Sequence, residues 1–161
     1  MSATLLNRFF GLQGCQYVKT MYHGPEAHFH ICDPRPQCAA CSSENVVRDE
    51  SKSRVFRSLA IGRKPSFAVL DIPRLQCRGC GVKRQARIRF ADPMKTYTRS
   101  FQRLALELLE LGTVQSVAHF LGIGWDLVKR IQKEHLRKQC AKPPLKKVTA
   151  IAIDEFHLGL K

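Results

Sequence analysis

The stretch that best defines the fold is residues 113–131, which read TVQSVAHFLGIGWDLVKRI. Thr113 is a good N-cap for a helix over Val114–Leu121. The turn 122–124 carries two glycines, and a second helix is expected over Trp125–Lys138. Upstream, apolar residues at helical spacing between 101 and 111 predict a preceding amphipathic helix. The apolar spacing within residues 113–131 predicts a helix-turn-helix, with an ordinary helical hairpin as the alternative. The apolar or small residues that fall where two steeply crossing helices share a core are Val117, Ala118, Leu121, Ile123, Val128 and Ile131.

The outer side of the second helix of this pair carries basic side chains. Lys129, Arg130 and Lys133 lie opposite the apolar positions, and Trp125 and Asp126 stand at the N-terminal end. In helix-turn-helix proteins this part of the second helix meets base edges in the major groove of DNA. We therefore expect these five residues to contact DNA, although Trp125 fits a core position equally well.

Four of the seven cysteines form two identical CxxC pairs, Cys38 with Cys41 and Cys77 with Cys80. Two residues between the thiols let both sulfur atoms turn inward from one tight turn, called a knuckle below. Two knuckles complete the tetrahedral shell of four sulfurs that zinc prefers. An odd number of cysteines argues against a disulfide framework, and redox chemistry would need only one pair. The sequence therefore predicts a structural Zn²⁺ on these four thiolates, with no open position for catalysis.

The 35 residues between the pairs leave room for two or three strands, the arrangement of a zinc ribbon. Alternating residues predict strands at 54–61 and 66–76, joined by a turn at 62–65. A further strand is predicted at Gln85–Phe90, with one apolar face and one basic face. Its basic side chains and their neighbour are expected to contact DNA phosphates: Arg84, Arg87 and Arg89.

The N-terminal segment is predicted to be a short helical or irregular lead followed by a β-hairpin, with strands at 16–22 and 27–32. Along the second strand His28, His30 and Cys32 share one face, which leaves a further metal site there as an open alternative. Cys15 and Cys140 read as ordinary thiols.

Beyond a basic, proline-containing linker, the apolar run Val148–Ile153 leads directly to Asp154 and Glu155. This pattern is typical of a buried strand that delivers a carboxylate to its end. A strand that simply ends in solvent is the alternative.

The composition, 44% hydrophobic and 25% charged over 161 residues, excludes a disordered or collagen-like chain. No apolar run is long enough to span a membrane, and no signal peptide is recognisable, so we expect a cytoplasmic protein. The net charge is +14, and residues 51–100 alone carry 13 basic and 2 acidic side chains. This concentration indicates a footprint for phosphates, although a solubilising surface would also explain it.

Taken in order, these pieces resemble the start of a bacterial insertion-sequence transposase of the ISL3 family. That family places a four-cysteine zinc ribbon before a helix-turn-helix and a DDE nuclease domain of RNase H-like fold. The resemblance covers nearly the whole chain, more loosely over residues 1–37, and depends on five stretches: 38–41, 75–81, 97–101, 116–128 and 152–156.

The resemblance implies that Asp154 is the first of three acidic residues that bind two Mg²⁺ ions in a full-length relative. The other two acids do not occur before residue 161. We therefore expect no transposase activity from this chain alone.

The sequence thus predicts an α+β protein with four parts: an N-terminal hairpin segment (1–37), a zinc ribbon (38–95), a three-helix helix-turn-helix domain (96–140), and a linker with the truncated first strand of an RNase H-like domain (141–161). Its expected partner is the double-stranded DNA of transposon terminal inverted repeats at the nucleoid, with a homodimer or a full-length transposase as further partners and no membrane. The alternatives are a zinc-containing helix-turn-helix transcription regulator, an active nuclease and a zinc-dependent protein-interaction module. Zinc removal is expected to unfold residues 30–95 and to spare 96–140.

Overall fold

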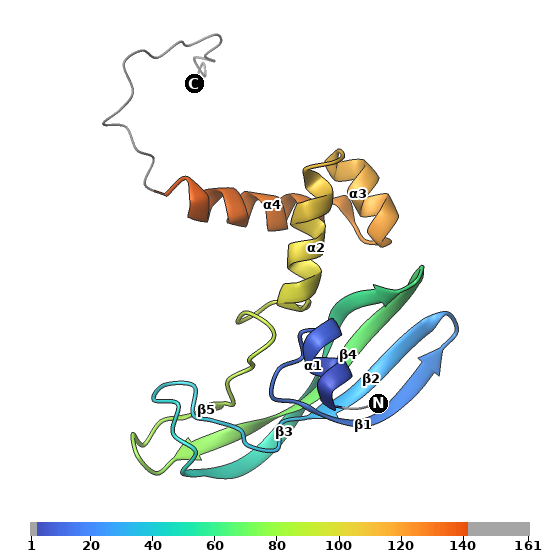
Figure 1. Cartoon of the computed structure of the whole chain (residues 1–161). Helices are drawn as coiled ribbons and strands as arrows, with labels where there is room; N and C mark the ends of the chain where they lie inside the picture. Colours follow the sequence, from blue (N-terminus) through green and yellow to red (C-terminus); the bar gives the residue numbers. More distant parts are fainter. Residues whose placement is uncertain (1–2, 142–161) are drawn as a thin grey trace, which may run out of the picture.

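The computed structural model describes residues 3–141, which form a β-sheet with one short helix against it and three helices at one end (Figure 1). The predicted linker and strand at 142–161, with Asp154, lie outside the described residues. In chain order the elements are α1 (Ala3–Phe9), β1 (Gln16–His23), β2 (Glu26–Cys32), β3 (Val46–Ile61), β4 (Lys64–Cys77), β5 (Lys83–Gln85), α2 (Arg99–Leu109), α3 (Val114–Leu121) and α4 (Trp125–Gln139). The α+β class predicted from the sequence is confirmed.

The sheet joins the N-terminal hairpin to the strands between the cysteine pairs. Its order is β1-β2-β4-β3, with β5 also paired to β4. The hairpin β1–β2 and the long hairpin β3–β4 are antiparallel, whereas β2 runs parallel to β4. The segments 1–37 and 38–95 therefore share one sheet.

One hydrophobic core forms between this sheet and the N-terminal segment. Side chains of α1 and the loop that follows it pack on the same face as the apolar residues of β2 and β4. Burial of this apolar surface stabilises the sheet independently of any metal. Its largest members are Leu6, Phe10, Leu12, Phe29, Ile31, Phe56, Leu70, Ile72, Leu75 and Phe90.

The strand predicted at Gln85–Phe90 is wrong beyond its first residue. After β5 ends at Gln85, the Ala86 N–H still donates to the Pro73 carbonyl, but the Arg87 N–H donates to the loop carbonyl of Gln37. The chain thus leaves the sheet after Ala86 and bends at residues 89–91. Ala86 and Phe90 are buried and Arg87 is exposed. The alternation of apolar and basic residues in the sequence reflects burial on one side of the segment. Such burial does not require that the segment pair as a strand.

The helical half agrees closely with the predicted pattern. The Thr98 and Thr113 hydroxyls accept the N–H groups of Phe101 and Ser116, which caps α2 and α3. Helix α3 has the predicted bounds and α4 runs one residue further than expected. The three helices bury a second core, separate from that of the sheet: Tyr97, Phe101, Ala105, Val117, Ala118, Leu121, Val128 and Ile131.

Arg57 connects the two cores. The segment before α2 adds to the free edge of β3, where Arg57 N–H donates to the Thr96 carbonyl (2.8 Å) and the Thr98 N–H donates to the Arg57 carbonyl (2.9 Å). The Arg57 guanidinium donates to the Leu121 carbonyl (3.0 Å) at the C-terminal end of α3. A positive charge at this end of a helix is favourable. This side chain therefore ties the helix-turn-helix to the sheet.

Candidate metal centre and nucleic-acid interface

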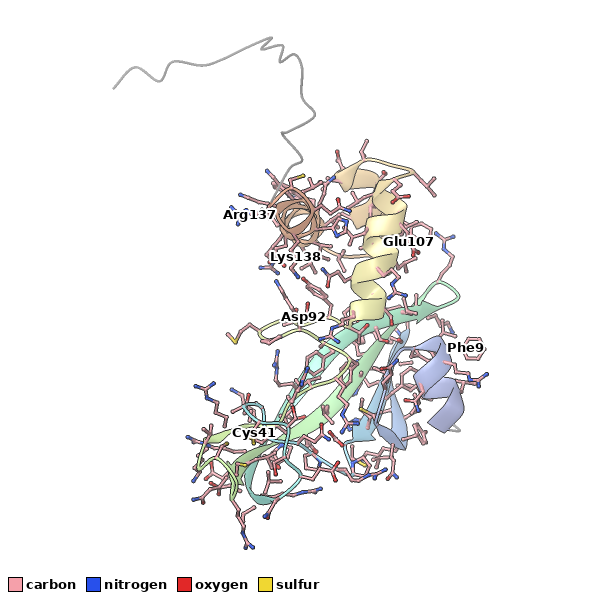
Figure 2. All side chains as sticks on the ribbon, turned by 60° about the vertical axis from the view of Figure 1, so that its left-hand side comes forward. Phe9, Cys41, Asp92, Glu107, Arg137 and Lys138 are labelled. Atoms are coloured by element: carbon pink, nitrogen blue, oxygen red, sulfur yellow. The ribbon has the colours of Figure 1, made fainter. Side chains whose placement is uncertain are left out.

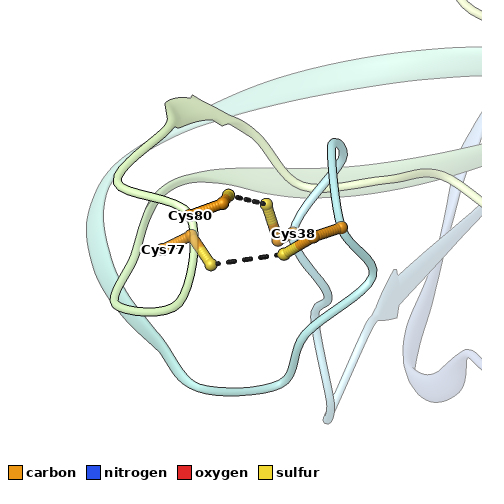
Figure 3. A group of neighbouring side chains, drawn as sticks. Cys38, Cys77 and Cys80 are labelled. Carbon is orange, nitrogen blue, oxygen red and sulfur yellow. Dashed lines mark hydrogen bonds between the residues drawn. The ribbon is translucent and has the colours of Figure 1, made fainter.

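The four cysteines of the two CxxC pairs converge at the end of the β3–β4 hairpin (Figure 3). Cys38 Sγ lies 3.7 Å from Cys80 Sγ, and Cys41 Sγ lies 3.5 Å from Cys77 Sγ. All four sulfur atoms lie within 4.8 Å of one another. Tetrahedral zinc with Zn–S bonds of about 2.3 Å separates its sulfurs by about 3.8 Å. The cluster is therefore compatible with a structural zinc ion.

The two knuckles have the same backbone geometry as each other. The N–H of the residue after each second cysteine donates to the carbonyl of the first: Ser42 to Cys38 and Gly81 to Cys77, both at 3.0 Å. Both residues have positive φ, 60° for Ser42 and 70° for Gly81. The sequence indicated this conformation at Gly81 because glycine adopts it easily. At Ser42 no residue type marked it.

Hydrogen bonds from the backbone favour the thiolate form at the first cysteine of each knuckle, Cys38 and Cys77. Backbone groups at Cys80 and Gly79 lower the pKa of the Cys77 thiol to about 6. Those at Cys41 and Ala40 lower the pKa of Cys38. A metal binds the thiolate and not the thiol, so these contacts favour the binding form of Cys77 and Cys38. At Cys41 a backbone hydrogen bond at Ser43 is outweighed by side-chain hydrogen bonds with Cys77 and Cys80, which raise the pKa of this thiol to about 12.

The other metal site that the sequence left open is not formed. His28 and His30 point to one side of β2 as expected, but His28 pairs with Glu26 (3.1 Å) and stacks on Phe67. Within residues 3–141, the four knuckle cysteines are the group that could hold a metal ion. Cys15 is buried, and burial raises the pKa of its thiol to about 12.

The predicted DNA-contacting residues of α4 are all exposed, and those of its inner side are buried. Val128 and Ile131 are 0% exposed. Trp125 is 53% exposed, with the Lys129 ammonium 5.4 Å from its ring centre. Trp125 is therefore not a core residue, which resolves the alternative left by the sequence. The other exposed members are Asp126, Lys129, Arg130 and Lys133.

The three arginines expected to contact DNA phosphates together are separated. Arg84 is exposed on β5, and exposed Arg87 donates to the Ser42 hydroxyl (3.4 Å) beside a knuckle. Arg89 is half-buried, donates to the Arg35 carbonyl (3.3 Å) and lines a different cleft, next to α1 and α2. The separation follows from the loss of the strand at 86–90.

Sequence reasoning missed the basic residues that accompany Arg84. A shallow cleft between β3, β4 and β5 is lined by Lys52, Arg74, Lys83 and Arg84, together with Glu50. These residues come from three strands, so their proximity depends on strand pairing. The excess of positive charge in residues 51–100 was the available signal.

Comparison with known proteins places this geometry in a family. Residues 86–136, which include the whole helical half up to the last turn of α4, match the helix-turn-helix domain of transposase family ISL3. Over 141 residues the chain is 32% identical to the transposase for insertion sequence element IS1001 of Bordetella parapertussis, an alignment that covers 86% of this chain. These two matches support a relation of the chain to the N-terminal part of an ISL3-family transposase. The family resemblance inferred from the sequence is confirmed.

This ISL3-type chain spans about a third of the length of that relative, 33%. No solved structure matches it. Among residues 3–141, no helix has the length and apolar character needed to cross a membrane.

Proposed function

We propose that this chain recognises the terminal inverted repeats of its own insertion sequence as double-stranded DNA. The observation that carries the proposal is that one side of α4 is buried and apolar while the other is exposed and basic. Its inner side is fully buried in the helical core, and its outer side presents Trp125, Asp126, Lys129, Arg130 and Lys133 to solvent. An exposed basic second helix of a helix-turn-helix suits the major groove of DNA.

The attachment of α4 to the rest of the molecule supports this role. Lys95, in the segment before α2, forms an ion pair with Glu134 of α4 (2.5 Å), and both side chains are half-buried. Together with the Arg57 contact to α3, this pair fixes the helix relative to the sheet. A rigidly held recognition helix loses little entropy on binding.

The metal end of the sheet is proposed to add phosphate contacts. In Figure 2, Arg137 and Lys138 of α4 and Cys41 of the first knuckle lie on the same side of the molecule. Near the knuckles, Arg84 and Arg87 are exposed, and Lys52, Arg74 and Lys83 surround Arg84. Such contacts position a protein on DNA without reading its sequence. We therefore propose zinc as the structural ion that fixes this phosphate-binding end.

Within this proposal the chain binds DNA and does not cut it. Asp154, the first DDE acid by resemblance, and the Mg²⁺ chemistry of a full-length relative belong to residues outside those described. A homodimer, or a complex with a full-length transposase, would pair two such recognition helices with two transposon ends. Its place in the cell would be the bacterial cytoplasm, at the nucleoid.

The test is a salt-titrated binding assay of the zinc-loaded chain with duplexes that carry the element's ends or a scrambled sequence. We expect tighter binding to the ends and a steep fall of affinity with salt. Arg130→Ala should cost about 1–3 kcal/mol on the ends and little on the scrambled duplex. Arg84→Ala should weaken both equally and lower the salt slope by about 1. Arg63→Ala, in the exposed β3–β4 turn, is the matched control. Equal binding to both duplexes would refute end recognition.

A further inference from the structure

A cleft of about 550 Å³ separates α1 and the loop after it from α2. It lies away from the recognition helix: Figure 2 shows Phe9 and Glu107, which line the cleft, on the side of α2 opposite Arg137 and Lys138 of α4. The proposed duplex contacts of α4 and the knuckles therefore do not use it.

The cleft carries a surplus of positive charge. Four arginines line it, Arg8, Arg89, Arg99 and Arg103, against the single carboxylate of Glu107 among the described residues. Arg99 is paired with Asp92 (2.8 Å) and Arg89 donates to a main-chain carbonyl. Among residues 3–141, the guanidinium groups of Arg8 and Arg103 have neither a hydrogen-bond partner nor an ion-pair partner, and both side chains are exposed. Two guanidinium groups are thus free to bind an anion.

An exposed aromatic ring stands beside these arginines. Phe9, the last residue of α1, is 71% exposed, although it lies next to the buried Phe10. An aromatic face at the rim of an arginine-lined cleft provides both a stacking surface for a base and cations for the backbone. A duplex about 20 Å wide cannot enter a cleft of this volume, whereas one or two nucleotides of a single strand can.

We propose that this cleft binds a single-stranded segment of DNA, with a base stacked on Phe9 and its phosphates held by Arg8 and Arg103. The site goes beyond duplex recognition by α4 and does not depend on it. Single-stranded binding would then occur on the opposite face of the chain from the duplex.

The test measures fluorescence anisotropy of a labelled oligothymidylate of about ten nucleotides with the full, zinc-loaded chain. The double variant Arg8→Ala/Arg103→Ala should weaken binding at least tenfold and lower the slope of log affinity against log salt by about 1.4. Phe9→Ala should weaken binding about 5- to 150-fold. Because all three side chains are exposed, the variants should keep the wild-type melting temperature, which is measured in parallel.

The matched control is Arg137→Ala/Lys138→Ala, which also removes two exposed positive charges but from α4. It should change oligothymidylate binding by less than about twofold, because only a weak and general effect of the lost charge remains at that distance. Equal losses in the two double variants would overturn the proposal, as would a Phe9→Ala variant that binds normally. Competition by polyglutamate as effective as by oligothymidylate would also overturn it, because the cleft would then accept any anion.

The outcomes for the two sites are distinguishable. Arg130→Ala should impair discrimination between duplexes and leave oligothymidylate binding unchanged. Failure of end recognition would not affect the cleft result, and failure of the cleft variants would not affect the duplex result.

Discussion

Arg57 shows how one side chain can set the relation between two packed units. Its guanidinium lies 4.9 Å from the ring centre of Phe67 on the sheet and 5.7 Å from that of Phe101 on α2, and it donates to the last carbonyl of α3. Burial lowers the pKa of Arg57, but an arginine remains charged at any physiological pH. The contact therefore combines a charge-assisted hydrogen bond with two cation–π interactions.

Arg57→Ala should lower the free energy of unfolding by about 2 kcal/mol, because the carbonyl and both rings lose their cationic partner. Arg57→Lys should recover only part of this, since an ammonium cannot lie flat between two rings. Urea unfolding measures both. Arg63→Ala, exposed in a turn, should stay within about 0.5 kcal/mol of wild type. A similar small effect at Arg57 would show that the two units are held by other contacts.

Gly11 brings the N-terminal segment close to α2. Its φ is +66°, and a Cβ atom there would lie only 2.2 Å from Ser100 Oγ. Gly11→Ala should therefore destabilise more than Gly24→Ala, which has a similar φ of +57° but open space around it and should cost about 1 kcal/mol. The double variant Gly11→Ala/Ser100→Ala should return to the Gly24→Ala value in thermal melts. Equal melting temperatures of the two single variants would show that Ser100 rotates away freely.

At the scale of single elements, the short helix α3 depends on its ends. It has eight residues, too few to be stable alone, with Thr113 capping its start and Gly122 in the left-handed conformation at its end. Thr113→Ala should cost about 1 kcal/mol of unfolding free energy, whereas Thr113→Ser should be nearly neutral. Chemical denaturation measures this, and Gln115→Ala on the exposed side of the same helix is the control. A neutral Thr113→Ala would mean that tertiary packing alone holds the first turn.

At the scale of the whole molecule, the metal end and the core of the sheet are distinct. Cys38 and Cys77 are buried at the knuckles but do not belong to the core that α1, β2, β3 and β4 share. The sequence-based expectation that residues 30–95 unfold without zinc assumed a ribbon with little core of its own. Since the N-terminal segment contributes to a core shared with these strands, we now expect zinc removal to affect only the region of the two knuckles.

Chelation should accelerate amide exchange at least about tenfold in residues 38–46 and 77–85 and leave the core strands and α2–α4 nearly unchanged. The reason for this expectation is that a bound ion would hold the two knuckles together, whereas the sheet core is made of apolar side chains that do not include the four cysteines. Cys80→Ser should reproduce the effect, and Cys140→Ser, exposed and outside the cluster, should not. Cooperative loss of all β-sheet circular dichroism on chelation would contradict this expectation and support the one from sequence.

The sequence by itself determined the local features. Thr113, Gly122 and the apolar spacing of α3 and α4 define the helix-turn-helix within the 27 residues 113–139. The CxxC pairs predicted the four cysteines that the structure brings within 4.8 Å of one another, because two residues between thiols suffice for each half of the cluster. In both cases the prediction rests on residues that are close together in the sequence.

Only the tertiary structure decided the features that join distant segments. The parallel pairing of β2 with β4 brings the N-terminal hairpin into the sheet, and no local pattern encodes the choice of strand partner. The alternation of buried and exposed residues at 86–90 looks the same whether the segment pairs as a strand or crosses the core as a loop, so only its hydrogen-bond partners distinguish the two. Arg8 and Arg103, 95 positions apart, line one cleft because α1 and the loop after it lie across from α2. Which distant segments lie close together depends on how the two cores pack, and this cannot be predicted from the periodicity of side chains along the sequence.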